Sequence, residues 1–323
     1  MILKIPINLI HPETNEKLQF NDINKNYFCE DFSFSHFEEI PNLFLDDDHP
    51  VTKIQSKFYN NIKFPNYDDI DNFGIFINKA EKSIFAKKLD DEIPMGADVL
   101  EAGCGTGQMS IYLSRYGRRI FGIDLSEGSL IEAKKFINQN DIKNVFLLKM
   151  NIFKLFFEKN FFDIVIANGV IHHTHNPELA FKKLVQVLKV NGIVVIGLYH
   201  KYGRLIHQLR KKLVYIFGDR LKVLDKRFSE NISYKKKYAW FLDQYKNPFE
   251  TTHTIAEVLK WFKEKNIQYL SSWPINFHYE DKLFEKNKIE SGFNLFFEEF
   301  MQAFNFRQLY EGGFFVMIGK KKY

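Results

Sequence analysis

The sequence predicts an α/β fold built on an open, mostly parallel sheet. First, the apolar run 98–100 passes into a turn rich in glycine, at Gly103, Gly105 and Gly107, which lets the backbone approach a ligand closely. Second, another apolar run, 119–123, ends in Asp124, roughly 20 residues beyond the turn, where a carboxylate accepts from ribose hydroxyls. The order strand, glycine turn, helix, strand and acid indicates a nucleoside-binding unit.

Length and composition are typical of a globular protein with a large core. With 323 residues, 45% hydrophobic and 16% aromatic, the chain can bury a large core in one extended domain or in two. A formal net charge of +5 does not require a nucleic-acid partner. Two cysteines, Cys29 and Cys104, exclude a disulfide framework and a four-cysteine zinc site. Because the N-terminus lacks a signal-peptide core and no run of about 18 apolar residues occurs, we expect a cytoplasmic protein without a membrane partner.

Before the first strand, residues 46–95 predict a linker and a helical lid. A helix begins near Val51, and a second helix over 73–90 should cover one face of the sheet. The aromatic residues Tyr59, Phe64 and Tyr67 precede the first strand, so they either pack in the core or touch the bound ligand.

After Asp124 the alternation of strands and helices continues. Ser126 is a candidate N-cap of a helix reaching about residue 140, and strands are expected over 145–149, 162–168 and 193–198. Ligands sit at the carboxyl edge of such a sheet, where four strand-end residues fall: Asn151, Ile152, Asn168 and Gly169. Two histidines follow, His172 and His173, which either pack locally or contact a ligand.

The spacing of the glycines in the turn narrows the class of ligand. Residues 101–107 have Gly-x-Gly-x-Gly, whereas a dinucleotide fingerprint needs Gly-x-Gly-x-x-Gly. The stretch resembles motif I of class I S-adenosylmethionine-dependent methyltransferases of type 11/12, and 122–126 looks like their motif II. The resemblance implies a seven-stranded Rossmann-like sheet with its last strand antiparallel, S-adenosylmethionine as cofactor, and a helical substrate cap. The implied cofactor contacts are Glu101, Gly103, Cys104, Gly105, Gly107, Asp124, Leu125, Asn151, Ile152, Asn168 and Gly169. Dinucleotide binding and a purely structural turn are the alternatives.

Residues 1–45 resemble the small zinc-ribbon module found at the head of many methyltransferases. His11-Pro-Glu-Thr14 stands where that module has Cys-Pro-x-Cys, and only Cys29 is left of the second pair. We therefore expect a degenerate packing module without metal. A site built from His11, Cys29, His36 or His49 lacks ligand spacing.

The C-terminal third interrupts and then completes the fold. The cofactor-binding core spans 96–198, a helical cap insertion spans 199–253, and 254–323 resumes the core with its own insertion at 276–312. The resumed part predicts a helix over 254–265 and strands over 268–273 and 313–319. Additions near the carboxyl edge usually cap a pocket and select substrate.

The methyl group of S-adenosylmethionine is already activated by its sulfonium, so the protein must align a nucleophile and exclude water. A base is needed only if that nucleophile arrives protonated. The candidates are Tyr245, Glu250 and His253, with Asp243 beside them, and each of them serves equally well as a tether of its loop.

We therefore expect a methyltransferase acting on a small-molecule acceptor. One rival is an RNA or tRNA methyltransferase that uses the basic segments 201–212 and 234–237, although a solvated helix face explains these as well. The basic residues of the first segment include Arg204, Arg210, Lys211 and Lys212. A SAM-binding regulatory protein without catalysis is the other rival. The acceptor and the oligomeric state stay open.

Overall fold

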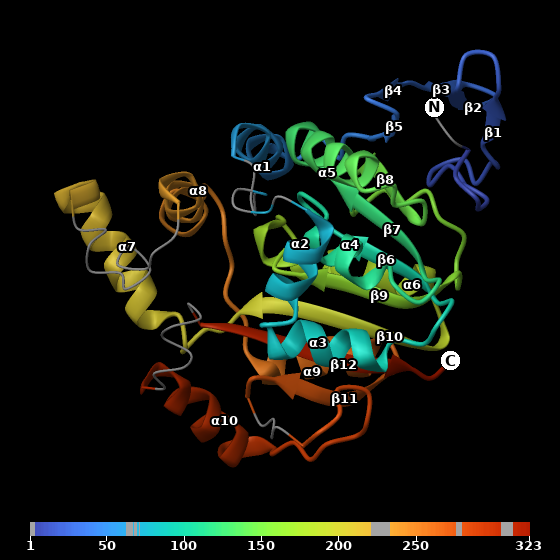
Figure 1. Cartoon of the computed structure of the whole chain (residues 1–323). Coiled ribbons are helices and arrows are strands. Elements are labelled where there is room, and N and C mark those ends of the chain that lie inside the picture. The colour runs from blue at the N-terminus through green and yellow to red at the C-terminus, as the bar shows by residue number, and fades with distance from the viewer. Residues whose placement is uncertain are drawn as a thin grey trace.

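A central twisted sheet with helices on both faces dominates the computed structural model (Figure 1). The structure describes residues 4–62, 67, 70, 72–220, 233–275, 280–304 and 313–323. Phe64, one of the aromatic residues considered above, lies outside these ranges.

Seven strands of this sheet form the expected core. They are β6 (Asp98–Ala102), β7 (Arg119–Asp124), β8 (Val145–Met150), β9 (Phe162–Asn168), β10 (Leu188–Tyr199), β11 (Ile267–Trp273) and β12 (Phe314–Lys321). Their order is β11-β12-β10-β9-β6-β7-β8, and β12 runs antiparallel to both of its neighbours. The α/β fold with a mostly parallel, Rossmann-like sheet and an antiparallel last strand is thereby confirmed.

The sheet is wider than the seven strands expected. Strand β5 (Ile40–Leu43) pairs in parallel with β8, and β4 (His36–Phe37) pairs with β5, which gives nine strands in the described ranges. An unpaired β8 would leave open backbone groups at the sheet edge, and β5 satisfies them. Residues 4–45 therefore pack on the main core, although β1 (Gln19–Asn21), β2 (Asn26–Cys29) and β3 (Phe32–Phe34) form a separate antiparallel sheet.

Side-chain caps fix where the helices begin. Ser126 accepts from the Ser129 amide at the start of α5 (Glu127–Gln139), and Thr254 does the same for α9 (Ile255–Glu264). The helix expected over 73–90 is in fact two, α2 (Phe73–Ala80) and α3 (Ile84–Glu92), because the Ser83 hydroxyl accepts from an amide and starts a new helix. The remaining core helices are α1 (Pro50–Asn61), α4 (Gln108–Leu113), α6 (Pro177–Val187) and the short η1 (Ile171–His173).

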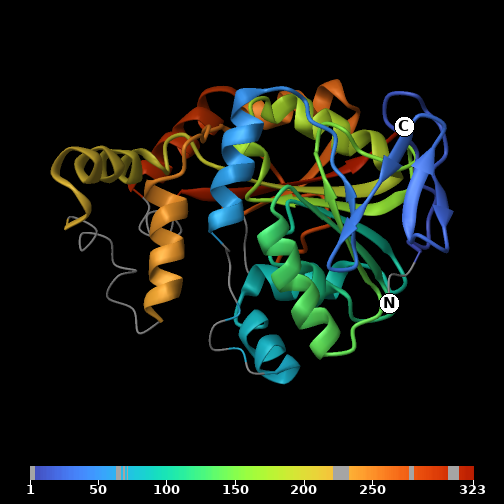
Figure 2. The same cartoon turned by 90° about the horizontal axis from the view of Figure 1, so that it is seen from above.

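The additions gather at one end of the sheet. Helices α7 (Leu205–Phe217) and α8 (Tyr234–Tyr245) leave the carboxyl end of β10, and α8 lies beside α1 when the molecule is seen from above (Figure 2). Helix α10 (Gly292–Met301) and η4 (Gln302–Phe304) precede β12. None of the helices in the described part of the chain is both long and apolar enough to cross a membrane.

Candidate functional site

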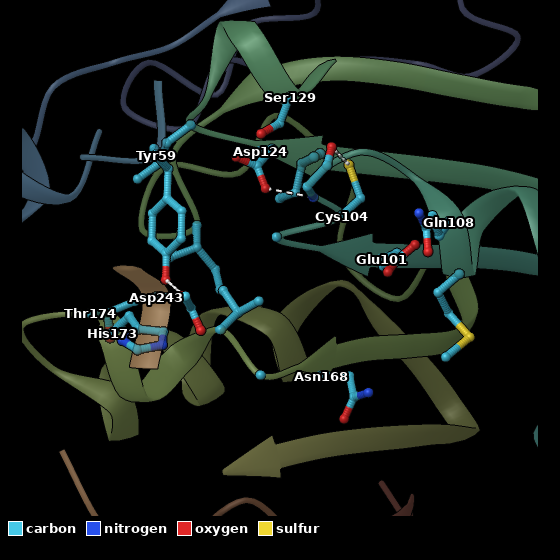
Figure 3. Close-up of a pocket in the computed structure, with 18 of the residues that line it drawn as sticks. Tyr59, Glu101, Cys104, Gln108, Asp124, Ser129, Asn168, His173, Thr174 and Asp243 are labelled. Carbon is cyan, nitrogen blue, oxygen red and sulfur yellow. Dashed lines mark hydrogen bonds between the residues drawn. The ribbon is translucent and has the colours of Figure 1, made fainter. Parts of the chain in front are cut away.

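A cavity of about 640 Å³ lies at the carboxyl edge of the sheet. The glycine turn, the ends of β6 to β10, and helices α1 and α8 all contribute to its wall (Figure 3). The strands thus bring together residues as far apart in the chain as Glu101 and Val316, as expected for an open α/β sheet.

The glycine turn is locked against the end of β7. The amides of Gly103 and Cys104 both donate to the Ile123 carbonyl, at 2.7 and 3.0 Å. Gly103 has φ of +69°, and a Cβ built there would lie 2.2 Å from Cγ2 of Val170. Only glycine therefore fits, both in conformation and in space.

Asp124 presents a fixed carboxylate to the cavity. Its Oδ2 accepts from the Gly105 amide and its Oδ1 from the Ser126 amide, each at 2.8 Å. Burial raises the pKa of Asp124, and these amide donors oppose that effect. Each oxygen keeps further acceptor capacity, so the group can receive two ribose hydroxyls without moving.

Glu101 is a buried acid on the same side of the cavity. Its carboxylate accepts from the Ser110 hydroxyl. Burial raises the pKa of Glu101 to about 8, so the group holds a proton at neutral pH when no cation lies beside it. A ligand ammonium placed next to it would favour the ionised form.

A polar network forms the opposite wall. The Tyr59 hydroxyl donates to Oδ1 of Asp243 at 2.9 Å, and Asn247 donates to the Tyr59 oxygen at the same distance. The amide of Gln244 donates to Oδ2 of Asp243 at 2.9 Å and to the Tyr199 hydroxyl at 2.8 Å. The carboxylate of Asp243 is thus held in one orientation by α1 and α8 together.

Arg204 supports this wall from behind. It is fully buried, lies 3.4 Å from the ring centroid of Tyr199, and donates to Oε1 of Gln244 at 3.1 Å and to Oε2 of Glu250 at 3.0 Å. Burial alone would raise the pKa of Glu250, but Arg204 and Lys211 hold it below its ordinary value. The buried cation is therefore paired, as a buried charge must be.

His173 reaches the same cavity from η1. Its Nδ1 lies 3.0 Å from the Phe249 carbonyl, an arrangement in which Nδ1–H donates and Nε2 carries the lone pair. Burial lowers the pKa of His173, so the imidazole is neutral at pH 7. Figure 3 shows the ring on the side of the cavity occupied by Tyr59 and Asp243.

Most of the residues expected to contact the cofactor line this one cavity. They are Glu101, Gly103, Cys104, Gly105, Asp124, Leu125, Ile152, Asn168 and Gly169. Two do not. Gly107 adopts φ of +74° at the N-cap of α4, and the Asn151 amide donates to the Leu45 carbonyl at 3.2 Å, away from the cavity. Asn151 is drawn aside because the N-terminal segment is added at that sheet edge.

The three residues suggested for catalysis lie outside the lining of the cavity that the described residues form, and their catalytic role stays a prediction. Tyr245 packs in a cluster with Phe241 and Val214. Glu250 is paired with Arg204. Nε2 of His253 lies 2.8 Å from the Thr251 hydroxyl, and its Nδ1 lies 3.0 Å from Oε1 of Glu257. The contacts of Tyr245 and Glu250 thus lie within the cap, whereas His253 is next to the start of α9.

Other cavity residues escaped the sequence analysis. Gln244 and Trp240 lie on α8, for which no motif exists, and Trp273 and Phe314 belong to strands interpreted only as core. Tyr199 ends the fifth strand at the carboxyl edge, and that position was the one available signal. Of the earlier aromatics, Tyr59 lines the cavity, whereas the Tyr67 hydroxyl donates to the Thr106 carbonyl at 2.7 Å and its ring stacks in the core.

The N-terminal module offers no gathered ligands. His11 stacks on Phe32 with ring centroids 4.2 Å apart, Cys29 is buried, and His49 caps α1. No group of three or more His, Cys, Asp or Glu suited to a metal ion occurs within the described ranges. Its likeness to a zinc ribbon stays a prediction.

Residues 100–196 match the family model of a methyltransferase domain. The ubiquinone biosynthesis O-methyltransferase of Rickettsia typhi is 31% identical over 120 residues, which are 37% of this chain and 44% of that protein. The demethylmenaquinone methyltransferase of Lactococcus lactis is 28% identical over 169 residues, which are 51% of this chain and 64% of that protein. The chain spans about half the length of the curated relatives it matches.

Magnesium protoporphyrin IX methyltransferase from Synechocystis, solved with S-adenosylhomocysteine, has a similar fold. The TM-score is 0.50 at 15% identity, with 84% of this chain and 99% of that chain covered. Residues 100–196 therefore match a methyltransferase domain, and the sheet around them has the Rossmann-like fold of that solved enzyme. The same findings support S-adenosylmethionine as the cofactor.

Proposed function

We propose that the protein transfers a methyl group from S-adenosylmethionine to an oxygen, nitrogen or carbon atom of a small molecule. One observation carries the proposal: a single cavity joins the glycine turn and Asp124 to His173, Tyr59 and Asp243. One of the two relatives above is named for ubiquinone biosynthesis and the other for demethylmenaquinone, which supports a small acceptor. A cytoplasmic location and the domain boundaries given above belong to the same proposal.

The cofactor half of the cavity fits S-adenosylmethionine. Asp124 offers acceptors for the ribose hydroxyls, and Glu101 is the acid available to the amino group. At Gly103 a Cβ would lie 2.2 Å from Cγ2 of Val170, so the turn has no room for a side chain. Asn168 and Gly169, at the end of β9, line the same half of the cavity. When bound, the sulfonium supplies a methyl group that is already activated.

The acceptor half then has to orient a nucleophile and take its proton. Nε2 of His173 is the group suited to this, since the imidazole is neutral and its other nitrogen is fixed by the Phe249 carbonyl. Asp243 and Tyr59 form a rigid polar edge that can hold a donor group of the acceptor. Helix α8 covers this half and excludes water.

The rival activity on nucleic acid loses support from the same geometry. Arg204, one of the four basic residues named for it, is fully buried and paired, and Lys211 lies 3.4 Å from Glu250. If Arg210 and Lys212 alone faced RNA, binding would be weak and would vanish at physiological salt. Tight RNA binding at that salt would reverse this choice.

Replacing Asp124 with alanine should weaken S-adenosylhomocysteine binding by about 1.5–3 kcal/mol, or roughly tenfold or more, because a charge-assisted acceptor for two hydroxyls is lost. Calorimetry measures the change. Asp22→Ala, in the β1–β2 turn, is a matched control that should leave the affinity unaltered. Unchanged affinity in a folded Asp124→Ala protein would remove Asp124 from the site.

Cofactor binding should also release protons at neutral pH. The free protein holds Glu101 protonated, with a pKa of about 8, and the bound ammonium should lower that pKa, so a fraction of a proton leaves at pH 7. Titrations with S-adenosylhomocysteine in buffers of different ionisation enthalpy measure this release. Glu101→Gln should abolish it, and equal release by that variant would show that another group is responsible.

A further inference from the structure

Helix α10 turns an aromatic face to solvent. Four phenylalanines, Phe293, Phe296, Phe300 and Phe304, form a row with successive ring centroids 6.3, 6.3 and 6.0 Å apart. Phe297 and Met301 lie beside this row, and all six side chains are exposed, Phe293 to 76%. Such a continuous apolar patch marks an interaction site.

Buried side chains fix the orientation of α10 about its own axis. Glu299 is buried, accepts from the Ile255 amide and lies 3.3 Å from Nε2 of His200. Leu295 and Ala303, one turn away on either side, are buried as well. The helix therefore buries an acid and exposes phenylalanines, which is the reverse of an ordinary surface helix.

Exposed apolar side chains also lie on α7, which Tyr202 links to α10. Tyr202, just before α7, contacts Phe296 and Phe300 edge-on, with centroids 6.0 and 5.8 Å away. The exposed apolar side chains of α7 are Leu205, Leu209, Tyr215, Ile216 and Phe217. Both views show α7 and α10 at the same end of the molecule (Figures 1 and 2). We call these exposed side chains of α7 and α10 the apolar end face.

The charge beside the apolar end face is basic. Helix α7 contains no acid, and its cations other than the paired Lys211 are Arg210 and Lys212; the exposed Lys235 lies in the first turn of α8. Asp219, which follows α7, is paired with Lys246 at 2.8 Å. On α10, Glu298 is half-buried and Glu299 is buried, while the exposed Glu290 precedes the helix and accepts from the Asn294 amide at 3.3 Å.

We propose that the apolar end face docks on the surface of an anionic lipid bilayer. Exposed aromatic side chains next to lysine and arginine suit the boundary between headgroups and acyl chains, where the rings enter and the cations meet lipid phosphate. A second copy of the chain is a poorer occupant, since a twofold contact sets the same basic residues against each other. The sequence analysis expected no membrane partner, and this inference departs from it.

Sedimentation with sucrose-loaded vesicles tests the docking, using the full chain. We expect binding to phosphatidylcholine vesicles that contain phosphatidylglycerol to be at least tenfold tighter than binding to phosphatidylcholine alone. The binding should weaken as salt is raised, because the basic residues contribute through electrostatics.

A triple variant, Phe293→Ser, Phe297→Ser and Phe304→Ser, separates the apolar part of the contact. We expect it to bind anionic vesicles at least tenfold more weakly, with unchanged affinity for S-adenosylhomocysteine as a check of folding. Ile23→Ser removes a side chain that is 91% exposed in the N-terminal module, and it should bind as the parent does.

Two results would overturn the proposal. One is the absence of vesicle binding at low salt, or equal binding by the parent and the triple variant. The other is a dimer, seen by analytical ultracentrifugation, that the triple variant dissociates, because a second copy would then cover the apolar end face.

Discussion

Replacing His173 with asparagine should lower the turnover number by about 10²–10⁴-fold, the scale of a lost general base, and leave S-adenosylhomocysteine affinity within a few fold. Asparagine keeps a donor for the Phe249 carbonyl and removes the lone pair that Nε2 presents to the cavity. The variant thus separates proton removal from support of the fold. Steady-state kinetics with the acceptor found by metabolite screening provide the measurement.

The pH profile distinguishes a base from a structural residue. Burial lowers the pKa of His173 below 6.5, so the parent enzyme should lose activity only as the pH falls below that value, when the imidazole becomes protonated. The asparagine variant should lack this acidic limb. As a control, His253→Asn alters a histidine outside the cavity and should keep the limb. If turnover by His173→Asn were normal, the base would have to be sought elsewhere.

Placing alanine at Gly103 should weaken S-adenosylhomocysteine binding by about 100-fold. The added Cβ meets Val170 at 2.2 Å in a backbone with φ of +69°, so either the turn or the valine must move into the cavity. An overpacked site of this kind costs about 1–3 kcal/mol, in addition to about 1–2 kcal/mol for the left-handed backbone. Calorimetry and thermal unfolding measure the two effects.

Gly96 offers a matched control for this change. It has φ of +70°, but nothing lies within 4 Å of a Cβ built there. Gly96→Ala should therefore show the conformational loss in stability without the loss in affinity. Equal affinities of the two alanine variants would mean that the Gly103 turn is not part of the cofactor site.

The core of the fold and the cofactor half of the cavity were predictable because their signals are local. The glycines, Asp124 and the apolar runs around them specify a strand, a turn and a helix within about 25 residues. Ser126 caps its helix as expected, and a helix begins after Thr254 as its sequence indicates, since N-caps act over three residues. Parallel pairing then brings the strand ends to one edge without further information.

The sequence offered Tyr59, His173 and Asp243 as candidates for the acceptor half but not their arrangement, because that depends on contacts between distant segments. Asp243 and Gln244 of α8 face the cavity, while Tyr245 packs in the cluster with Phe241. The orientation of α8 about its own axis produces this division, and the sequence of α8 alone does not determine that orientation. Packing against Tyr59 of α1, far away in the chain, does. Asn151 is turned aside for a similar reason, as its partner Leu45 belongs to a segment that joins the sheet from the N-terminus.

The central claim is that one cavity binds the cofactor and carries out the transfer. Its most direct test is the transfer of tritium from methyl-labelled S-adenosylmethionine into a metabolite extract, with the parent, Asp124→Ala and His173→Asn proteins compared at the same subsaturating cofactor concentration. We predict labelled product with the parent and much less with either variant, with cofactor affinity lost only in Asp124→Ala. Full transfer by both folded variants would contradict the claim.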